Sequence, residues 1–328
     1  MMKNSNQKPI NWKQLLTENS ALWALIFLCI VATVLLGNSF LNVQNITNIL
    51  MGNAIIGIIA LGMTLVIIVG GIDLSVGSVS VGSGLVALTV MNATGNILLG
   101  ILAAIAAGVL MGAISGTLIA AFRLPAFIAT LGLMRVYRSV AQHYFSGGAA
   151  ILDRDINEGF LSIANTQIGG LVPLPIIYWL GLCMMIDLLT KKTAFGRHIY
   201  AVGSNERATN LSGINTAKIK ILVYMVSGFL VAIAAIVEAS RMGSMNSTAS
   251  GGSYELEAIA AVVIGGAAMS GGKGRIMGTL FGTLTLGVIN NMMNQLGFPS
   301  FLVGAIQGGI IIVAVLIQRL VAKQEKQY

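Results

Sequence analysis

Long apolar runs recur along this chain, and they constrain its fold more than any other feature. Apolar residues make up 56% of the sequence and charged residues only 9%, whereas soluble domains carry about 25% charged residues. Apolar runs of 18 or more residues are typical of helices that cross a bilayer, because about 20 helical residues span its hydrocarbon core. The sequence therefore predicts an all-α polytopic membrane protein.

We place about ten transmembrane helices along the chain, at 20–37, 48–69, 75–93, 97–121, 125–144, 171–189, 217–239, 255–269, 276–296 and 300–319. The spans at 75–93 and 255–269 are short for a bilayer, so we expect them to be tilted, broken or partly buried in protein. The spans form a single domain over 20–320, with tails at 1–19 and 321–328. The first run lacks a small-residue cleavage site, so no cleavable signal is expected.

The distribution of basic residues predicts the orientation, because basic loops are retained on the cytoplasmic side. With the N-terminus inside, 15 of the 19 basic residues fall on the cytoplasmic side, while Arg154 and Arg241 fall outside. Both termini are therefore expected in the cytoplasm. This placement also explains the net charge of +8, so we expect the lipid bilayer, and no nucleic acid, as a partner.

One long basic segment, Lys191–Lys220, interrupts the apolar pattern. Its 30 residues hold seven charges, six of them basic. A membrane protein keeps such a segment in water, and its basic character favours the cytoplasmic face. We interpret it as a surface on which another molecule docks; a solvated loop without a partner is the alternative.

Asp73 is a candidate residue for a transport pathway, because a carboxylate at membrane depth needs a partner or a water-filled cavity. It follows two glycines and stands two residues before Ser75. In one interpretation Asp73 and Ser75 shape or gate the cytoplasmic end of a pathway. In the other, which we favour, Asp73 caps a helix that begins at Leu74.

Four further ionisable residues belong to the same candidate set. Arg135 and Arg138 lie inside a predicted span, where guanidinium groups are rare, and they either line a polar path or extend toward the membrane surface. Glu255 and Glu257 open another span, where acidic residues also suit a helix start.

Glycine patterns indicate how the spans pack. Gly108, Gly112 and Gly116 stand four apart, as do Gly278 and Gly282, and such spacing allows helix backbones to approach closely. Two Gly-rich segments, VGGIDLSVG at 69–77 and IGGAAMSGG at 264–272, each follow one span and precede another. This likeness is compatible with a parallel pseudo-repeat or with chance.

The residues that catalysis would need are largely missing. The run GGKG at 271–274 has Gly where a nucleotide-binding loop has Ser or Thr. Only two histidines occur, and Cys29 and Cys183 lie within apolar runs, so we expect no metal site, disulfide or histidine-based catalysis. The chain is therefore expected to be neither an enzyme nor the holder of a cofactor.

Four motifs carry a family resemblance: GGIDLSVGS at 70–78, LPAFIATLG at 124–132, GRHIYAVGSNERATNLSGIN at 196–215 and YELEAIAAVVIGGAAMSGGKGRIMGT at 254–279. Together they resemble the permease subunit of bacterial monosaccharide ABC importers, with the ribose type as the closest pattern. The resemblance covers about residues 40 to 320. It implies a multi-pass inner-membrane subunit that works with a separate ATPase holding ATP and Mg, with a periplasmic sugar-binding protein, and with a second permease subunit, which we expect to be a copy of this chain.

The resemblance also implies a short cytoplasmic coupling helix that fits the ATPase. By position it covers Ser204–Ser212, where Ser204 and Asn205 suit an N-cap and Glu206 suits a first turn. Gly213 suits a helix stop. The residues expected to couple the chain to the ATPase are Ser204, Asn205, Glu206, Arg207, Ala208, Leu211 and Gly213.

Cargo is not readable from the residues, and alternatives stay open. An ABC permease for a furanosyl signal or for branched-chain amino acids would present the same features. A secondary transporter is a further alternative, and it would work without an ATPase.

Overall fold

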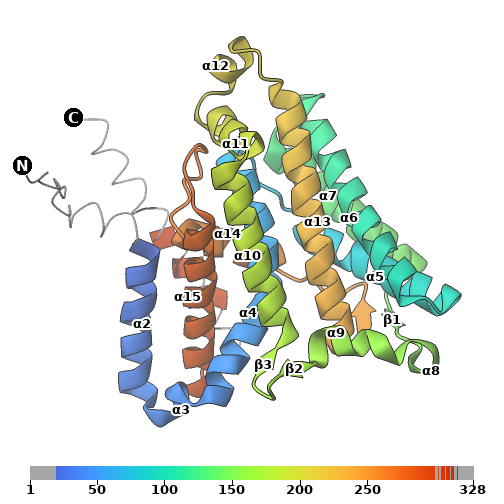
Figure 1. The fold of residues 1–328 in the computed structure, drawn as a ribbon, viewed down its shortest axis with the longest axis vertical. Helices are drawn as coiled ribbons and strands as arrows, with labels where there is room; N and C mark the ends of the chain where they lie inside the picture. The colour runs from blue at the N-terminus through green and yellow to red at the C-terminus, as the bar shows by residue number, and fades with distance from the viewer. Residues whose placement is uncertain are drawn as a thin grey trace, which may run out of the picture.

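The structure, a computed structural model, describes residues 20–299 and scattered positions between 302 and 316. Its long helices run side by side along one axis (Figure 1). The predicted tails at 1–19 and 321–328 and much of the predicted span at 300–319 lie outside the described residues.

Among the described residues, six helices are long and apolar enough to cross a membrane. They are α4 (Val43–Ile68), α5 (Val76–Thr94), α6 (Ile97–Ala120), α10 (Leu174–Lys192), α13 (Thr216–Met242) and α15 (Ile276–Gln295). Three more predicted spans are also helical: α2 (Ser20–Leu36), α7 (Ala126–Tyr144) and α14 (Tyr254–Ile264). The 11 residues of α14 rise only about 17 Å, so this span is short, as predicted.

Shorter elements lie at the two ends of the bundle (Figure 1). One end carries α11 (Ala194–Ser204) and α12 (Glu206–Leu211), and we call it the α12 end. The opposite end carries α3 (Asn38–Leu41), α8 (Arg154–Asn157), the 3-10 helix η1 (Glu158–Leu161), α9 (Ser162–Asn165) and the short pair β2 (Gln167–Ile168) and β3 (Val172–Pro173). There β1 (Ala149–Ile151) also pairs antiparallel with β4 (Ser244–Asn246). The sequence did not predict these strands.

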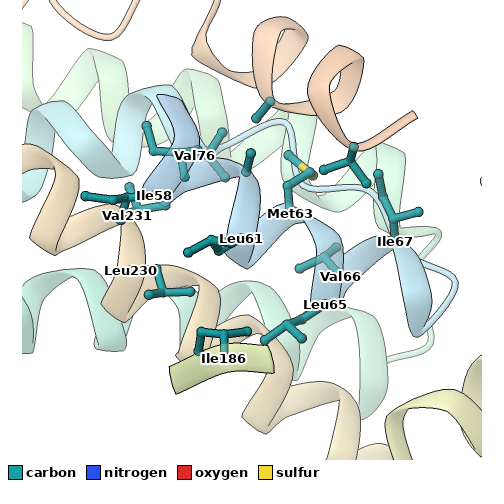
Figure 2. Packing of buried hydrophobic residues seen from close by; sticks show 14 of the residues in the cluster. Ile58, Leu61, Met63, Leu65, Val66, Ile67, Val76, Ile186, Leu230 and Val231 are labelled. Carbon is teal, nitrogen blue, oxygen red and sulfur yellow. The ribbon is translucent and has the colours of Figure 1, made fainter. Parts of the chain in front are cut away.

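Helix α4 forms the centre of the core. It packs against α10, α13, α14 and α15, and every residue from Ala54 to Ile68 is buried. A helix that is apolar on all sides is stable only where other helices surround it. Figure 2 shows its Ile58, Leu61 and Leu65 among side chains from neighbouring helices, including Ile186 and Leu230.

The glycine rows make close helix contacts, which confirms the packing predicted from their spacing. A Cβ on Gly112 of α6 would overlap the carbonyl oxygen of Tyr224 on α13, and a Cβ on Gly116 would overlap the Cα of Ile221 on the same helix. On α15, a Cβ on Gly282 would overlap the carbonyl oxygen of Ala261 on α14. These helices therefore meet backbone to backbone.

The two Gly-rich segments share one turn structure. Gly70 and Gly266 have φ values of 88° and 87°, and the next residue in each turn donates its N–H to a carbonyl five residues earlier. Both turns close a helix that runs toward the α12 end (Figure 1). The two Gly-rich segments therefore form the same turn in the same direction, as a parallel pseudo-repeat predicts.

The helix packing adds a second correspondence, of opposite sense. In this correspondence α4, α5 and α6 match α13, α14 and α15 in that order. The first helix of each group packs on the third helix of the other group: α4 on α15, and α13 on α6. The middle helices pack in matching places, α5 against α6 and α13, and α14 against α15 and α4. Since α4 and α13 run in opposite directions (Figure 1), this correspondence relates α4–α6 to α13–α15 by inversion. Helices α5 and α14 begin next to each other, where a Cβ on Gly77 would overlap the carbonyl oxygen of Gly251.

Candidate functional site

The basic segment Lys191–Lys220 contains two short helices. The coupling helix predicted over Ser204–Ser212 corresponds to α12 with its caps, whereas α11, which precedes it, was not predicted. Thr193 caps α11 by accepting a hydrogen bond from the N–H of Gly196 at 3.1 Å. Asn205 caps α12 by accepting from the N–H of Ala208 at 2.9 Å, and Gly213 follows with φ 84°. Ser204, predicted as an alternative cap, instead ends α11.

The residues expected to contact an ATPase are all exposed on this segment. They are Ser204, Asn205, Glu206, Arg207, Ala208, Leu211 and Gly213. Leu211 is 83% exposed, although an apolar side chain at the water-facing end of a membrane protein gains nothing from exposure. The structure thus presents an apolar contact at the tip of α12, flanked by charged residues.

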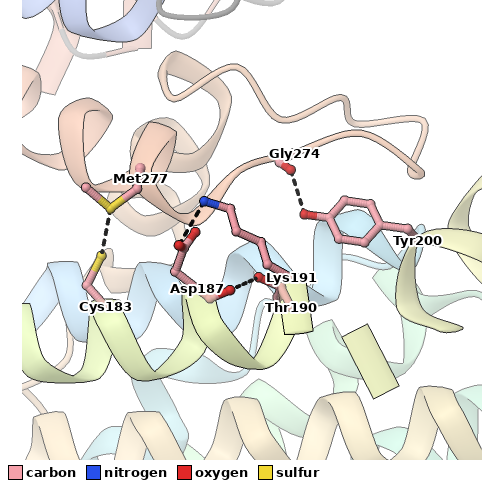
Figure 3. A network of polar contacts seen from close by, with 7 residues as sticks. All are labelled: Cys183, Asp187, Thr190, Lys191, Tyr200, Gly274 and Met277. Carbon is pink, nitrogen blue, oxygen red and sulfur yellow. Dashed lines mark hydrogen bonds and ion pairs between the residues drawn. The ribbon is translucent and has the colours of Figure 1, made fainter. Parts of the chain in front are cut away.

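Helix α11 is joined to the bundle through backbone contacts. A Cβ on Gly203 would overlap the carbonyl oxygen of Ile68 at the end of α4, and this carbonyl also accepts the N–H of Gly272 at 2.8 Å. Tyr200 donates its hydroxyl to the carbonyl of Gly274 at 2.7 Å (Figure 3). We call these contacts between α11, the end of α4 and the 265–275 loop the α11 junction.

Two further features complete the surroundings of α12. Glu206 pairs with Lys220 of α13 at 2.6 Å, and both partners keep some exposure. A cavity of about 1080 Å³ lies between α12, the start of α13 and the turn between α6 and α7.

The hydroxyl of Tyr200 in the α11 junction stays protonated, because burial raises its pKa. It therefore remains a neutral hydrogen-bond donor to the carbonyl of Gly274.

Asp73 and Ser75 are buried and are hydrogen-bonded to each other. Oδ1 of Asp73 accepts the N–H of Ser75 at 2.9 Å and its hydroxyl at 2.6 Å. Helix α5 begins at Val76, two residues later than predicted. The N-cap of α5 is Ser75, and no side chain makes a cap hydrogen bond there, so the prediction that Asp73 caps a helix beginning at Leu74 is wrong. The Asp73 carboxylate instead closes a turn just before the helix. A gating role for the pair stays a prediction.

Arg138 holds a loop that is distant in sequence. Its Nη1 donates to the carbonyls of Ser247 at 3.2 Å and Ser250 at 2.7 Å. Carbonyls that no helix satisfies are costly at membrane depth unless a donor reaches them. Arg138 therefore stabilises the non-helical stretch that leads into α14.

Arg138 also lines a polar cleft of about 290 Å³ between α5, α7 and the start of α14. The cleft brings together three of the predicted residues: Arg135, Arg138 and Glu255. Glu257, by contrast, does not line it. The remaining lining residues were not predicted: Ser78, Met134, Gln142, Thr248, Gly251, Gly252 and Ser253.

Glu238 is a functional candidate that the sequence analysis missed. It is buried on α13, against the Tyr254 side chain and within electrostatic range of Arg138. A glutamate inside a predicted span was a usable signal, since ionisable residues at membrane depth are functional candidates. No cluster of three or more potential metal ligands occurs in the described part of the chain.

The fold and these sites define an integral membrane protein of many helices, with an exposed helical segment at one end and a polar cleft within the bundle. The chain belongs to the family described as the permease component of the branched-chain amino acid transport system, whose model matches residues 45–315.

Several individual relatives are ribose import permeases. The chain is 42% identical to ribose import permease protein RbsC of Escherichia coli K12, over 92% of this chain and 94% of the relative. It is 41% identical to RbsC of Haemophilus influenzae (96% and 97% covered) and 40% identical to RbsC of Bacillus subtilis (90% and 90% covered). No solved structure matches the chain. These relatives confirm the resemblance to ribose-type permeases.

Proposed function

We propose that this chain is the membrane-spanning permease subunit of an ATP-driven ABC importer that moves a ribose-like monosaccharide into the cytoplasm. The observation that carries the proposal is the exposed, capped α12, joined by α11 to the core of a chain that resembles ribose import permeases along most of its length. ATP and Mg would be held by a separate ATPase, so this chain would hydrolyse nothing.

In this proposal the ATPase binds α12 from the cytoplasm. Leu211 would fill an apolar pocket of the ATPase, with Glu206 and Arg207 pairing at its rim. Because the α11 junction is built from backbone contacts, a displacement of α12 would move the end of α4 and the 265–275 loop with it. Both chain termini would lie on this side.

The sugar would pass through the polar cleft. Arg135, Arg138 and Glu255 offer hydrogen-bond donors and acceptors to sugar hydroxyls, whereas Asp73, Ser75 and Glu257 would act at its margins. A second permease subunit, a copy of this chain, would complete the walls of the pathway. A periplasmic sugar-binding protein would supply most of the specificity.

Uptake by purified components tests the proposal. The chain would be reconstituted into proteoliposomes with its ATPase and its sugar-binding protein, and radiolabelled ribose would be supplied from the binding-protein side. We expect accumulation with ATP and none with ADP. Uptake of leucine in place of ribose would favour the alternative of a permease for branched-chain amino acids, which is the cargo that the family description names. Accumulation driven by a proton gradient without ATP would identify a secondary transporter.

A further inference from the structure

Helix α7 presents an exposed arginine halfway along its length. The helix begins at the turn beside α12 and ends shortly before β1, at the opposite end of the bundle. Arg135 is the tenth of its 19 residues, about 14 Å from the start, and it is exposed. It makes no hydrogen bond or ion pair with the described part of the chain. A guanidinium group at this depth is unstable against lipid, and its side chain is too short to reach either membrane surface.

The exposed face of α7 is of mixed polarity, in contrast to that of α6 beside it. Ser139 and His143 are exposed one and two turns beyond Arg135, and the apolar Val136 and Val140 are exposed between them. The exposed residues of α6 form one purely apolar row: Leu98, Leu99, Leu102, Ala106, Leu110 and Ile114. The row on α6 suits lipid, whereas the face of α7 suits contact with protein or water.

Non-helical backbone is exposed beside α7 at a similar depth. Helix α14 runs toward the α12 end (Figure 1) and is about 17 Å long, so it starts roughly halfway across a hydrocarbon core of about 30 Å. Gly252 and Ser253, which directly precede it, are exposed. Arg138 of α7 donates to the carbonyls of Ser250 and Gly251, just before them. Irregular backbone within the hydrocarbon region needs cover from protein or from a water-filled space, so a second observation argues against lipid on this face.

The polar cleft joins these two exposed features. Its lining includes Arg135 of α7 together with Gly252 and Ser253 of the loop. Because these residues are exposed, the described chain leaves the cleft open on the side of α7. The described positions between 306 and 313 do not cover it, since they line a groove with α2, on the opposite side of the bundle (Figure 1). The cleft is therefore incomplete within the described chain.

We propose that the exposed face of α7 is the interface with a second copy of this chain, and that the two copies close their polar clefts against each other. A twofold pair places the same surface of both subunits in contact, so α7 and the 252–253 backbone would meet their equivalents. Val136 and Val140 would pack at the contact, while Arg135 would face the water-filled space between the clefts. The inference rests on the proposed second permease subunit and specifies the surface that it covers.

Cysteine cross-linking in proteoliposomes tests the interface. The full-length chain would first receive Cys29→Ala and Cys183→Ala. Single cysteines would then be placed along the exposed face of α7 by Gly132→Cys, Val136→Cys and Val140→Cys. We expect a short bifunctional maleimide to shift at least one of these variants from monomer to dimer size in a denaturing gel.

The apolar row on α6 provides the matched control. Leu102 and Val140 are 53% and 51% exposed, and both lie toward the end of the bundle opposite α12. Leu102→Cys in the same cysteine-free chain should therefore stay at monomer size. A dimer band of equal yield in Leu102→Cys would show that the cross-links come from random collisions in the bilayer.

Bulky substitutions provide a second measurement. Val136→Trp with Val140→Trp should block the contact without disturbing the core, because both residues are exposed. Native mass spectrometry from nanodiscs should then show dimers of the wild-type chain and monomers of this variant. Leu102→Trp with Leu110→Trp, on the exposed row of α6, should remain dimeric.

The absence of a dimer band in all three α7 variants would overturn the proposal, as would dimers that survive Val136→Trp with Val140→Trp. ATP-driven ribose uptake by the wild-type chain is measured separately. Uptake without α7 cross-links would reject this interface and leave the transport proposal standing. Cross-links without ribose uptake would support the interface and count against the proposed cargo.

Discussion

The α11 junction and the polar cleft both hold a segment against the helix bundle, but by different chemistry. At the junction, glycine backbone meets backbone, and Gly203 leaves no room for a side chain beside Ile68. At the cleft, the long side chain of Arg138 reaches the carbonyls of a loop. Backbone packing transmits a displacement almost rigidly, whereas a long side chain can move its hydrogen bond from one carbonyl to another. The α11 junction therefore suits the proposed coupling to an ATPase, and the polar cleft suits a proposed pathway whose shape must change.

The largest effect should come from breaking the junction. Gly203→Val places a branched side chain on the carbonyl of Ile68, and overpacking of this kind costs about 1–3 kcal/mol. Because the displaced contact is also the proposed coupling route, we expect sugar uptake to fall roughly tenfold or more. Radiolabelled uptake in proteoliposomes measures it.

Gly181→Val is the matched control. Gly181 lies on α10 beside open space, since a Cβ there would meet nothing within 4 Å, and its substitution should leave uptake unchanged. Wild-type uptake in Gly203→Val would mean that the junction tolerates a side chain and does not transmit displacement.

A smaller but clear effect is expected at the cleft. Arg138→Met removes the charge-assisted hydrogen bonds to the carbonyls of Ser247, Ser250 and Gly251, and such bonds are worth about 1.5–3 kcal/mol each, so the loop before α14 should loosen. We expect a several-fold loss of uptake with normal membrane insertion. Arg135→Met, which removes a charge from the same cleft, should also lower uptake but should leave the loop before α14 as protected from hydrogen exchange as in the wild-type chain. Equal loop protection in the Arg138→Met and Arg135→Met variants would argue against loop anchoring by Arg138.

Removing one hydroxyl from the junction should have a modest effect. Tyr200→Phe eliminates the hydrogen bond to the Gly274 carbonyl, worth about 1 kcal/mol. We expect a small decrease in thermal stability in detergent. Tyr178→Phe on α10 controls for the loss of a hydroxyl. An equal decrease in both variants would argue against a stabilising role for the hydrogen bond between Tyr200 and Gly274.

The smallest effect is expected for Lys220→Gln. It breaks the ion pair with Glu206, and exposed pairs contribute about 0–1 kcal/mol. The stability change should therefore stay below about 1 kcal/mol and shrink further at high salt. A larger change, measured by the same thermal unfolding, would mean that the pair anchors α12 to α13.

The sequence predicted the spans well because bilayer thickness fixes the length of an apolar run. It also located α12, since Asn205 and Gly213 are local signals. It missed α11, whose short amphipathic pattern with basic residues is typical of a loop as well. It could not place Arg138 on the 247–251 loop, because that contact joins residues more than a hundred positions apart.

The proposed docking of an ATPase on α12 is tested most directly by Glu206→Lys with Arg207→Glu. The reversal changes the charges at the rim of α12 and leaves Leu211, the Asn205 cap and the α11 junction in place. In proteoliposomes that contain the ATPase and the sugar-binding protein, ATP-driven ribose uptake should fall sharply while membrane insertion stays normal. Uptake equal to that of the wild-type chain would contradict the assignment of α12 as the docking element.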